Sequence, residues 1–127
     1  YIEHTTNTGT GGSWNVTHDA TTGTTADADD TETKVAIGAW CSTSRSSTDY
    51  YIRRTFLVFN TPSISVMPSA ATLKIYGYSN ATGDIIAIEG TWNGAGVLTT
   101  GMYNDFTGYA SGWDSGDVTA YSSEVSS

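Results

Sequence analysis

The chain has 127 residues, 13 acidic side chains against 5 Lys and Arg, and a formal net charge of −8. This length fits one domain with a two-layer core, and this charge argues against nucleic-acid binding, because phosphates need cationic partners. No apolar run in the sequence approaches the length of a membrane span, so membrane insertion is not expected.

Threonine, serine and glycine are the commonest residues, and no apolar pattern with helical spacing extends far. Threonine fits the pleated surface of a sheet, while glycine and serine favour turns. We therefore expect an all-β fold. The single cysteine, Cys41, has no partner for a disulfide within the chain.

Residues 1–33 are predicted to be a polar, irregular N-terminal segment that ends in an exposed acidic loop. The loop carboxylates are hard oxygen ligands of the kind that calcium prefers: Asp27, Asp29, Asp30 and Glu32. The loop lacks the Gly at position six and the distal Glu of an EF-hand. Two interpretations stay open, a calcium site and a solvated acidic loop.

Two strands are predicted next. Residues 34–40 place apolar side chains at alternate positions, as expected for a strand with one buried face. Ile52–Phe59 is the longest strand candidate, and its last four residues are apolar on both faces, so we expect a central strand covered on both sides at that end. Pro62 and Pro68 confine the following segment to a loop, because proline cannot serve in a central ladder.

Further strands are predicted at Thr72–Tyr78 and Ile85–Glu89, joined as an antiparallel hairpin, and at Val118–Val125. We divide the chain into the polar segment with the acidic loop, residues 1–33, and a β-sandwich module, residues 34–127, within one domain overall.

The block Ile52–Thr61, followed by Ala71–Tyr76, resembles a recurrent jelly-roll module. The usual pattern of that family is an arginine, an apolar strand ending in Phe-Asp-Thr, a proline-containing loop, and Ser-Ala-x-Leu before a strand. Tyr103–Phe106 and Asp117–Tyr121 resemble the later part of the module. Such modules occur in bacteriophage and environmental virion proteins and in secreted bacterial proteins. The secreted group includes DNRLRE-type modules, some of which bind acidic polysaccharide.

The resemblance implies a jelly-roll-like antiparallel β-sandwich. The chain departs from the pattern at Asn60, where the family usually has aspartate, and it stops where the family module continues with further strands. Either the chain is a fragment, or strands of a neighbouring subunit complete the sheet. In the second case the open edge is an assembly device, since an unpaired edge is a template for another strand.

Arg53 and Arg54 are adjacent in a predicted strand, so their side chains should point to opposite faces. They are candidates for binding a carboxylate of a partner or of a uronic-acid sugar. The competing interpretation is a structural salt bridge to a loop aspartate.

Several aromatic side chains are candidates for contacts with a partner or a sugar: Trp14, Trp92, Trp113 and Tyr103. For Trp92, and for Trp40, we favour the alternative that they close the ends of the sandwich. Trp14 and Trp113 lie in predicted polar loops. The sequence is equally compatible with their contacting a partner and with their being exposed to solvent.

Two functions fit these features. The first is a non-enzymatic structural module of a bacteriophage-like virion or an extracellular surface assembly, which contacts copies of itself or other structural subunits through sheet edges and aromatic patches. The alternative is a carbohydrate-binding module of a secreted bacterial protein, which binds polysaccharide through Arg, Trp and Tyr. Enzymatic activity is not expected, because nothing groups His4 or His18 with a nucleophile and no Gly-x-Ser-x-Gly motif occurs.

Overall fold

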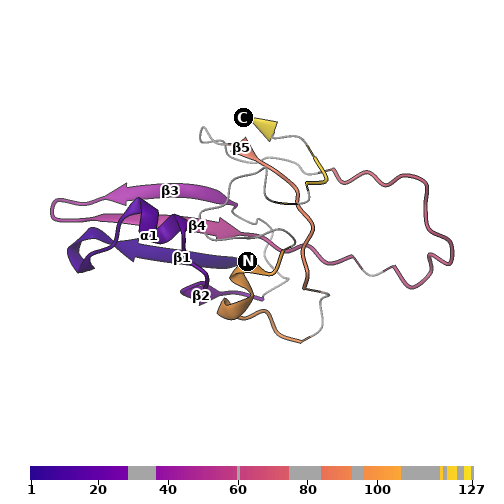
Figure 1. Ribbon diagram of the computed structural model, residues 1–127, viewed down its shortest axis with the longest axis horizontal. Helices are drawn as coiled ribbons and strands as arrows, with labels where there is room; N and C mark the ends of the chain where they lie inside the picture. The colour runs from indigo at the N-terminus through magenta and orange to yellow at the C-terminus, as the bar shows by residue number, and fades with distance from the viewer. Residues whose placement is uncertain are drawn as a thin grey trace.

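The computed structural model of the protein describes residues 1–28, 37–59, 61–74, 84–92, 96–106, 118, 120–122 and 125–126. Its main element is a four-stranded antiparallel sheet with the strand order β2-β1-β4-β3 (Figure 1). The strands are β1 (Ile2–Asn7), β2 (Thr25–Ala26), β3 (Gly38–Thr43) and β4 (Thr48–Arg54). Helical structure in these ranges is confined to α1 (Trp14–His18) and the 3₁₀ helices η1 (Thr8–Thr10) and η2 (Thr100–Asn104). The all-β prediction is confirmed.

Strands β3 and β4 form a tight hairpin. The N–H of Ser44 donates to the carbonyl of Ser47 at 2.8 Å, which closes a turn with Arg45 and Ser46 at its tip. From this turn the pairing runs from Thr43 opposite Thr48 to Gly38 opposite Arg53. The predicted strand over residues 34–40 overlaps β3, which continues to Thr43; residues 34–36 lie outside the described part of the chain.

Strand β1 lies inside the sheet, between β2 and β4, with Ile2 opposite Arg54 and Asn7 opposite Asp49. The prediction of an irregular N-terminal segment is wrong for these residues. The sequence of β1 is Ile-Glu-His-Thr-Thr-Asn, and Ile2 is its one buried apolar residue. The strand therefore lacks the alternation of apolar and polar residues that predicts a half-buried strand. Its threonines favour the extended backbone all the same.

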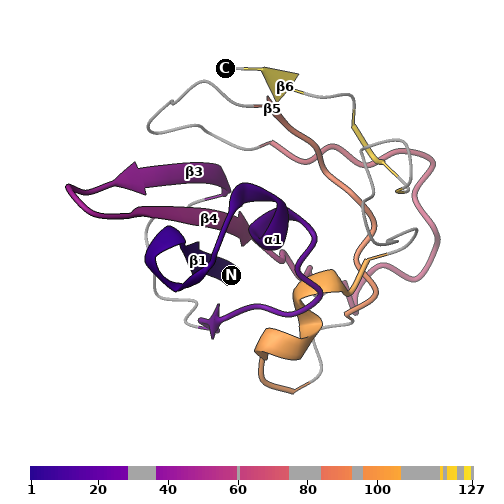
Figure 2. The same ribbon diagram turned by 60° about the vertical axis from the view of Figure 1, so that its left-hand side comes forward.

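The core lies against one face of the sheet, where Ile2, Ala26 and Ile52 project. Ile2 and Tyr103 have no exposed surface, and Leu98 packs with them. Figure 2 shows η2, which contains Tyr103, beside the end of this sheet, and α1 in front of β4. A ring contact between Trp14 and Tyr50 at 6.3 Å holds α1 on this same face.

Gly23 allows the chain to pass closely over the core. A Cβ atom at this position would lie 2.3 Å from Cγ2 of Ile2, so only glycine fits without a shift. The N–H of Gly23 donates to the carbonyl of Thr100 at 2.8 Å, which ties the segment before β2 to η2.

Pairing in the later part of the chain is sparse among the described residues. Strand β5 (Asp84–Ile85) pairs with β6 (Val125–Ser126), and single bridges join Ile88 to Ala120 and Gly90 to Phe106. The predicted hairpin is not formed by its described residues, because β5 pairs with β6. Leu73 and Lys74 have no strand structure, and residues 75–83 lie outside the described ranges.

The predicted strand Ile52–Phe59 is wrong in its second half. Strand β4 ends at Arg54, and Leu57, Val58 and Phe59 are exposed rather than covered on both sides. Figure 1 shows residues 61–74, drawn in pink, as a wide loop that extends away from the four-stranded sheet. The apolar run that predicted a central strand therefore continues into an exposed loop.

Candidate interaction site

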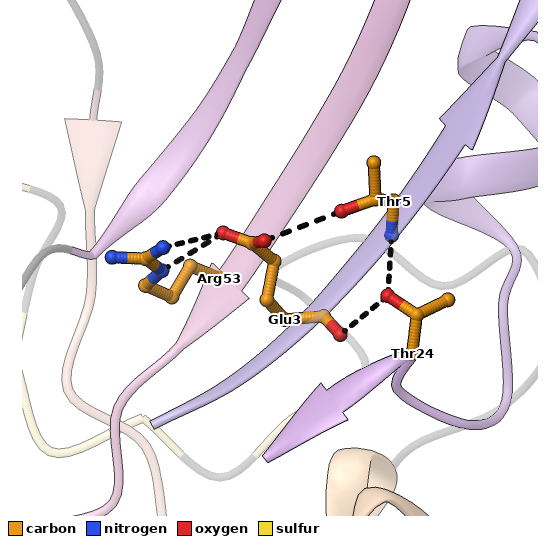
Figure 3. Close-up of polar contacts among 4 residues, drawn as sticks. All are labelled: Glu3, Thr5, Thr24 and Arg53. Carbon is orange, nitrogen blue, oxygen red and sulfur yellow. Dashed lines mark hydrogen bonds and ion pairs between the residues drawn. The ribbon is translucent and has the colours of Figure 1, made fainter. Parts of the chain in front are cut away.

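Arg53 lies on the sheet face opposite the core. Its Nε and Nη2 atoms donate to Oε2 of Glu3 at 3.0 and 2.6 Å (Figure 3). The two side chains are 20% and 13% exposed, and Oε1 of Glu3 also accepts a hydrogen bond from Thr5. The guanidinium lies 4.0 Å from the ring centre of Tyr1. Arg53 thus forms a structural ion pair within the sheet, with a strand glutamate instead of the loop aspartate that we considered.

The Tyr1 amino group belongs to the same region. Its nitrogen donates to the carbonyl of Asp27 at 2.8 Å. Desolvation lowers the pKa of this amino group below its usual value of 8.0; the Asp27 carboxylate opposes the shift and the Arg53 charge adds to it.

Arg54 points to the core face. Its Nη1 atom donates to the carbonyl of Tyr103 at 2.7 Å and also bonds to Oδ1 of Asn104. The guanidinium stacks 3.8 Å from the ring centre of Tyr103 and 5.0 Å from that of Phe106. Arg54 therefore links β4 to η2. Both arginines direct their donors to groups of the protein itself.

Replacing Glu3 by glutamine should lower the free energy of unfolding by about 1–2 kcal/mol, because it leaves a half-buried Arg53 without a counter-charge. Urea denaturation followed by circular dichroism measures the change. Asp19→Asn is the matched control, since the His18–Asp19 pair is exposed at both side chains and should contribute about 0–0.5 kcal/mol. Equal effects of the two variants would contradict a structural role for the Glu3–Arg53 pair.

The predicted aromatic contact residues fall in different environments. Tyr103 is fully buried in the core, so its assignment as a partner contact is wrong. Trp92 packs against the core, with its ring edge-on to Phe56 at 6.1 Å. Trp14 is exposed at the start of α1, and Trp113 lies outside the described residues.

The acidic loop that we considered for calcium falls mostly outside the description, which includes Asp27 but not Asp29, Asp30 or Glu32. The backbone of Asp27 is paired with Tyr1, whose carbonyl accepts its N–H at 2.9 Å. In the described part of the chain, no three His, Cys, Asp or Glu residues lie close enough to hold a metal ion. Calcium binding by the loop stays a prediction.

Strand β3 forms an edge of the sheet, and its residues from Ala39 to Thr43 are all exposed. Trp40 was expected to close one end of a sandwich, but it lies on this open edge with 38% of its surface exposed. Its ring stacks on that of Tyr51, with centres 5.0 Å apart and planes within 6°. The alternation of apolar and polar residues predicted a strand up to Trp40, but it did not indicate that this strand lies at the edge of the sheet.

A second exposed feature is the segment that follows β4. We call residues 57–59 and 61–73 the apolar loop. Its large apolar side chains are between 48% and 91% exposed: Leu57, Val58, Phe59, Ile64, Val66, Met67 and Leu73. Phe59, Ala71, Thr72 and Leu73 line a hollow of about 160 Å³ at its base. From the sequence, Leu57–Phe59 was assigned to a covered central strand and the segment with Pro62 and Pro68 to a loop.

A further hollow of about 330 Å³ lies where β1 runs into η1 and α1. Its lining residues are mostly threonine and glycine: Thr5, Thr6, Asn7, Thr10, Gly11, Gly12 and Val16.

No family model, curated protein or solved structure matches this chain. The resemblance to virion and DNRLRE-type jelly-roll modules therefore stays a prediction. Within the described ranges no helix is both long and apolar enough to cross a membrane.

Proposed function

We propose that the protein is a non-enzymatic structural module of a virion or extracellular surface assembly, built as a jelly-roll-like sandwich, and that the apolar loop contacts a neighbouring subunit. The observation that supports this proposal is the exposure of large apolar side chains along one continuous segment. Monomeric soluble proteins seldom leave such segments uncovered.

Burial of this segment against a partner is energetically favourable. Removing apolar surface from water contributes about 25 cal/mol per Å², or about 1.5–3 kcal/mol for a fully buried leucine, valine or phenylalanine side chain. Phe59 and Met67 belong to residue types that are enriched at the centres of protein interfaces. Met67 is 91% exposed, so nearly all of its side chain is accessible to a partner.

The alternative function, carbohydrate binding through arginine and aromatic side chains, has weaker support. An arginine that recognises a uronic acid needs donors that the protein has not already engaged. Arg53 donates to Glu3, and Arg54 donates to Tyr103 and Asn104. Of the tryptophans proposed for that role, Trp92 packs against the core.

Size-exclusion chromatography with light scattering tests the proposal. The wild-type chain should form concentration-dependent assemblies, and Val66→Asp/Met67→Asp should shift them to smaller species, because both side chains are largely exposed and the fold should tolerate the charges. Val97→Asp is the matched control, since Val97 is 73% exposed, close to the 77% of Val66, and lies outside the apolar loop.

Two outcomes would overturn the proposal. One is a wild-type chain whose size does not depend on concentration. The other is an equal loss of assembly in the loop variant and in Val97→Asp. A monomer whose tryptophan fluorescence changes on addition of an acidic polysaccharide would support the carbohydrate-binding alternative instead.

A further inference from the structure

The backbone of β3 presents a row of hydrogen-bonding groups at the open edge. The Ser44–Ser47 hydrogen bond fixes the phase of the β3–β4 ladder, because bonded and non-bonded pairs alternate along an antiparallel pair. Counting back from the turn, every second residue of β3 bonds to β4: Ser42, Trp40 and Gly38. The N–H and C=O groups of the intervening residues, Ala39, Cys41 and Thr43, therefore point away from β4.

Residues 38–43 lack the sequence features that usually prevent an edge strand from pairing with another strand. Natural edge strands are protected by lysine, proline, bulges or short length. Residues 38–43 contain no charged residue and no proline, and they pair with β4 over six consecutive positions without a bulge. The opposite edge strand, β2, is only two residues long.

The ring of Trp40 is arranged to continue a stack across the edge. Tyr51 covers the indole face on the β4 side, at 5.0 Å and nearly parallel. In the described part of the chain β3 is the last strand of this sheet, and Trp40 keeps 38% of its surface exposed although Tyr51 and the Arg53 guanidinium, 5.3 Å from the ring centre, lie against the indole. An aromatic ring from an added strand would stack on this exposed surface.

We infer that β3 pairs antiparallel with β3 of a second copy. The two copies are related by a two-fold axis that passes between their Trp40 residues. In this register Ala39 bonds to Cys41 of the second copy, and the two Trp40 residues occupy a non-hydrogen-bonded pair, where side chains approach most closely. The stack then runs Tyr51, Trp40, Trp40, Tyr51 across the axis. Residues 38–43 carry no charged side chain, so no charged residue of the strand faces its copy in this register. The nearest cation, Arg53 at 5.3 Å from the Trp40 ring centre, is paired with Glu3 of its own chain.

A second two-fold register, centred on Cys41, is also compatible with the outward-pointing groups. It places Trp40 opposite Ser42 of the second copy and loses the stacking of the two indole rings, which stabilises a pair beyond the burial of its surface. The register centred on Trp40 is therefore favoured. This surface is separate from the apolar loop, so the inference does not rest on the proposed loop contact.

Disulfide trapping distinguishes the registers. The full chain with Val66→Asp/Met67→Asp serves as background, so that the loop contributes no assembly. Ala39→Cys should give a covalent dimer on mild oxidation, because residue 39 then faces Cys41 of the second copy at a Cα separation of about 5.5 Å, within disulfide range. Thr43→Cys is the matched control on the same exposed strand and should not enrich the dimer above background.

Two outcomes would overturn this register. One is a covalent dimer of the background protein, linked through Cys41 alone. The other is equal cross-linking of the Ala39→Cys and Thr43→Cys variants. Trp40→Lys in the same background should convert the dimer to a monomer in light scattering. A background protein that is monomeric at about 100 μM would overturn the dimer itself, whatever the loop does.

Discussion

Replacing Ile2 by alanine is expected to lower the free energy of unfolding by about 2–5 kcal/mol. Ile2 has no exposed surface and packs with Leu98 and Tyr103, so the substitution removes buried methyl groups and leaves a cavity. Gly23 already lies against Cγ2 of Ile2, which limits how far the chain can collapse into the space. This loss is a large share of the about 5–15 kcal/mol that stabilises a typical domain.

Urea denaturation of dilute protein measures the change, with the slope of the transition compared between variants. Ile64→Ala is the matched control, because Ile64 is about half exposed in the apolar loop and its truncation should change stability by less than about 0.5 kcal/mol. If the two isoleucine variants unfold at the same urea concentration, the core is not where this structure places it.

Replacing Arg54 by methionine should lower the free energy of unfolding by about 3 kcal/mol. The aliphatic length is retained, but the hydrogen bonds from the charged guanidinium to Tyr103 and Asn104 are lost, and such bonds contribute about 1.5–3 kcal/mol each. The stacking on the ring of Tyr103 is lost as well. Because Arg54 joins β4 to η2, the variant should loosen η2 first.

Thermal unfolding and amide exchange of Thr100–Asn104 test this expectation together. Arg45→Met provides the control, since Arg45 lies exposed at the tip of the β3–β4 turn. An Arg54→Met protein with wild-type stability, or with unchanged exchange in η2, would contradict the link between β4 and η2.

The sequence was sufficient for the fold class but not for the order of the strands. Thr-rich composition and the absence of helical periodicity correctly predicted β structure. The apolar run Ile52–Phe59 located β4 but set its end five residues too late, because apolarity does not distinguish a buried strand from an exposed loop. Strand β1 was not predicted, because its residues are mostly polar and its one buried isoleucine gives no alternation of apolar and polar side chains.

The candidate site was less predictable still. Arg53 and Arg54 stood out in the sequence, but their partners, Glu3 and Tyr103, lie about 50 residues away in opposite directions along the chain. Only the pairing of β1 with β4 brings Glu3 beside Arg53. Trp40 was expected to close one end of the sandwich, and no local pattern in the sequence shows that its strand is the last of the sheet in the described part of the chain.

The pairing of the first strand with late parts of the chain has a consequence for biosynthesis. Ile2 needs Leu98 and Tyr103 to complete its environment, and Gly23 bonds to Thr100, so the core cannot close until synthesis has proceeded about 100 residues beyond Ile2. At about 5–20 residues per second, this interval lasts about 5–20 s. Once Arg54 has left the ribosome, the β3–β4 hairpin has all its strand residues and needs only local contacts, and the apolar loop follows it into water before the core closes. The β3 edge that we infer to pair is therefore present on neighbouring nascent chains of one messenger before either chain has finished folding.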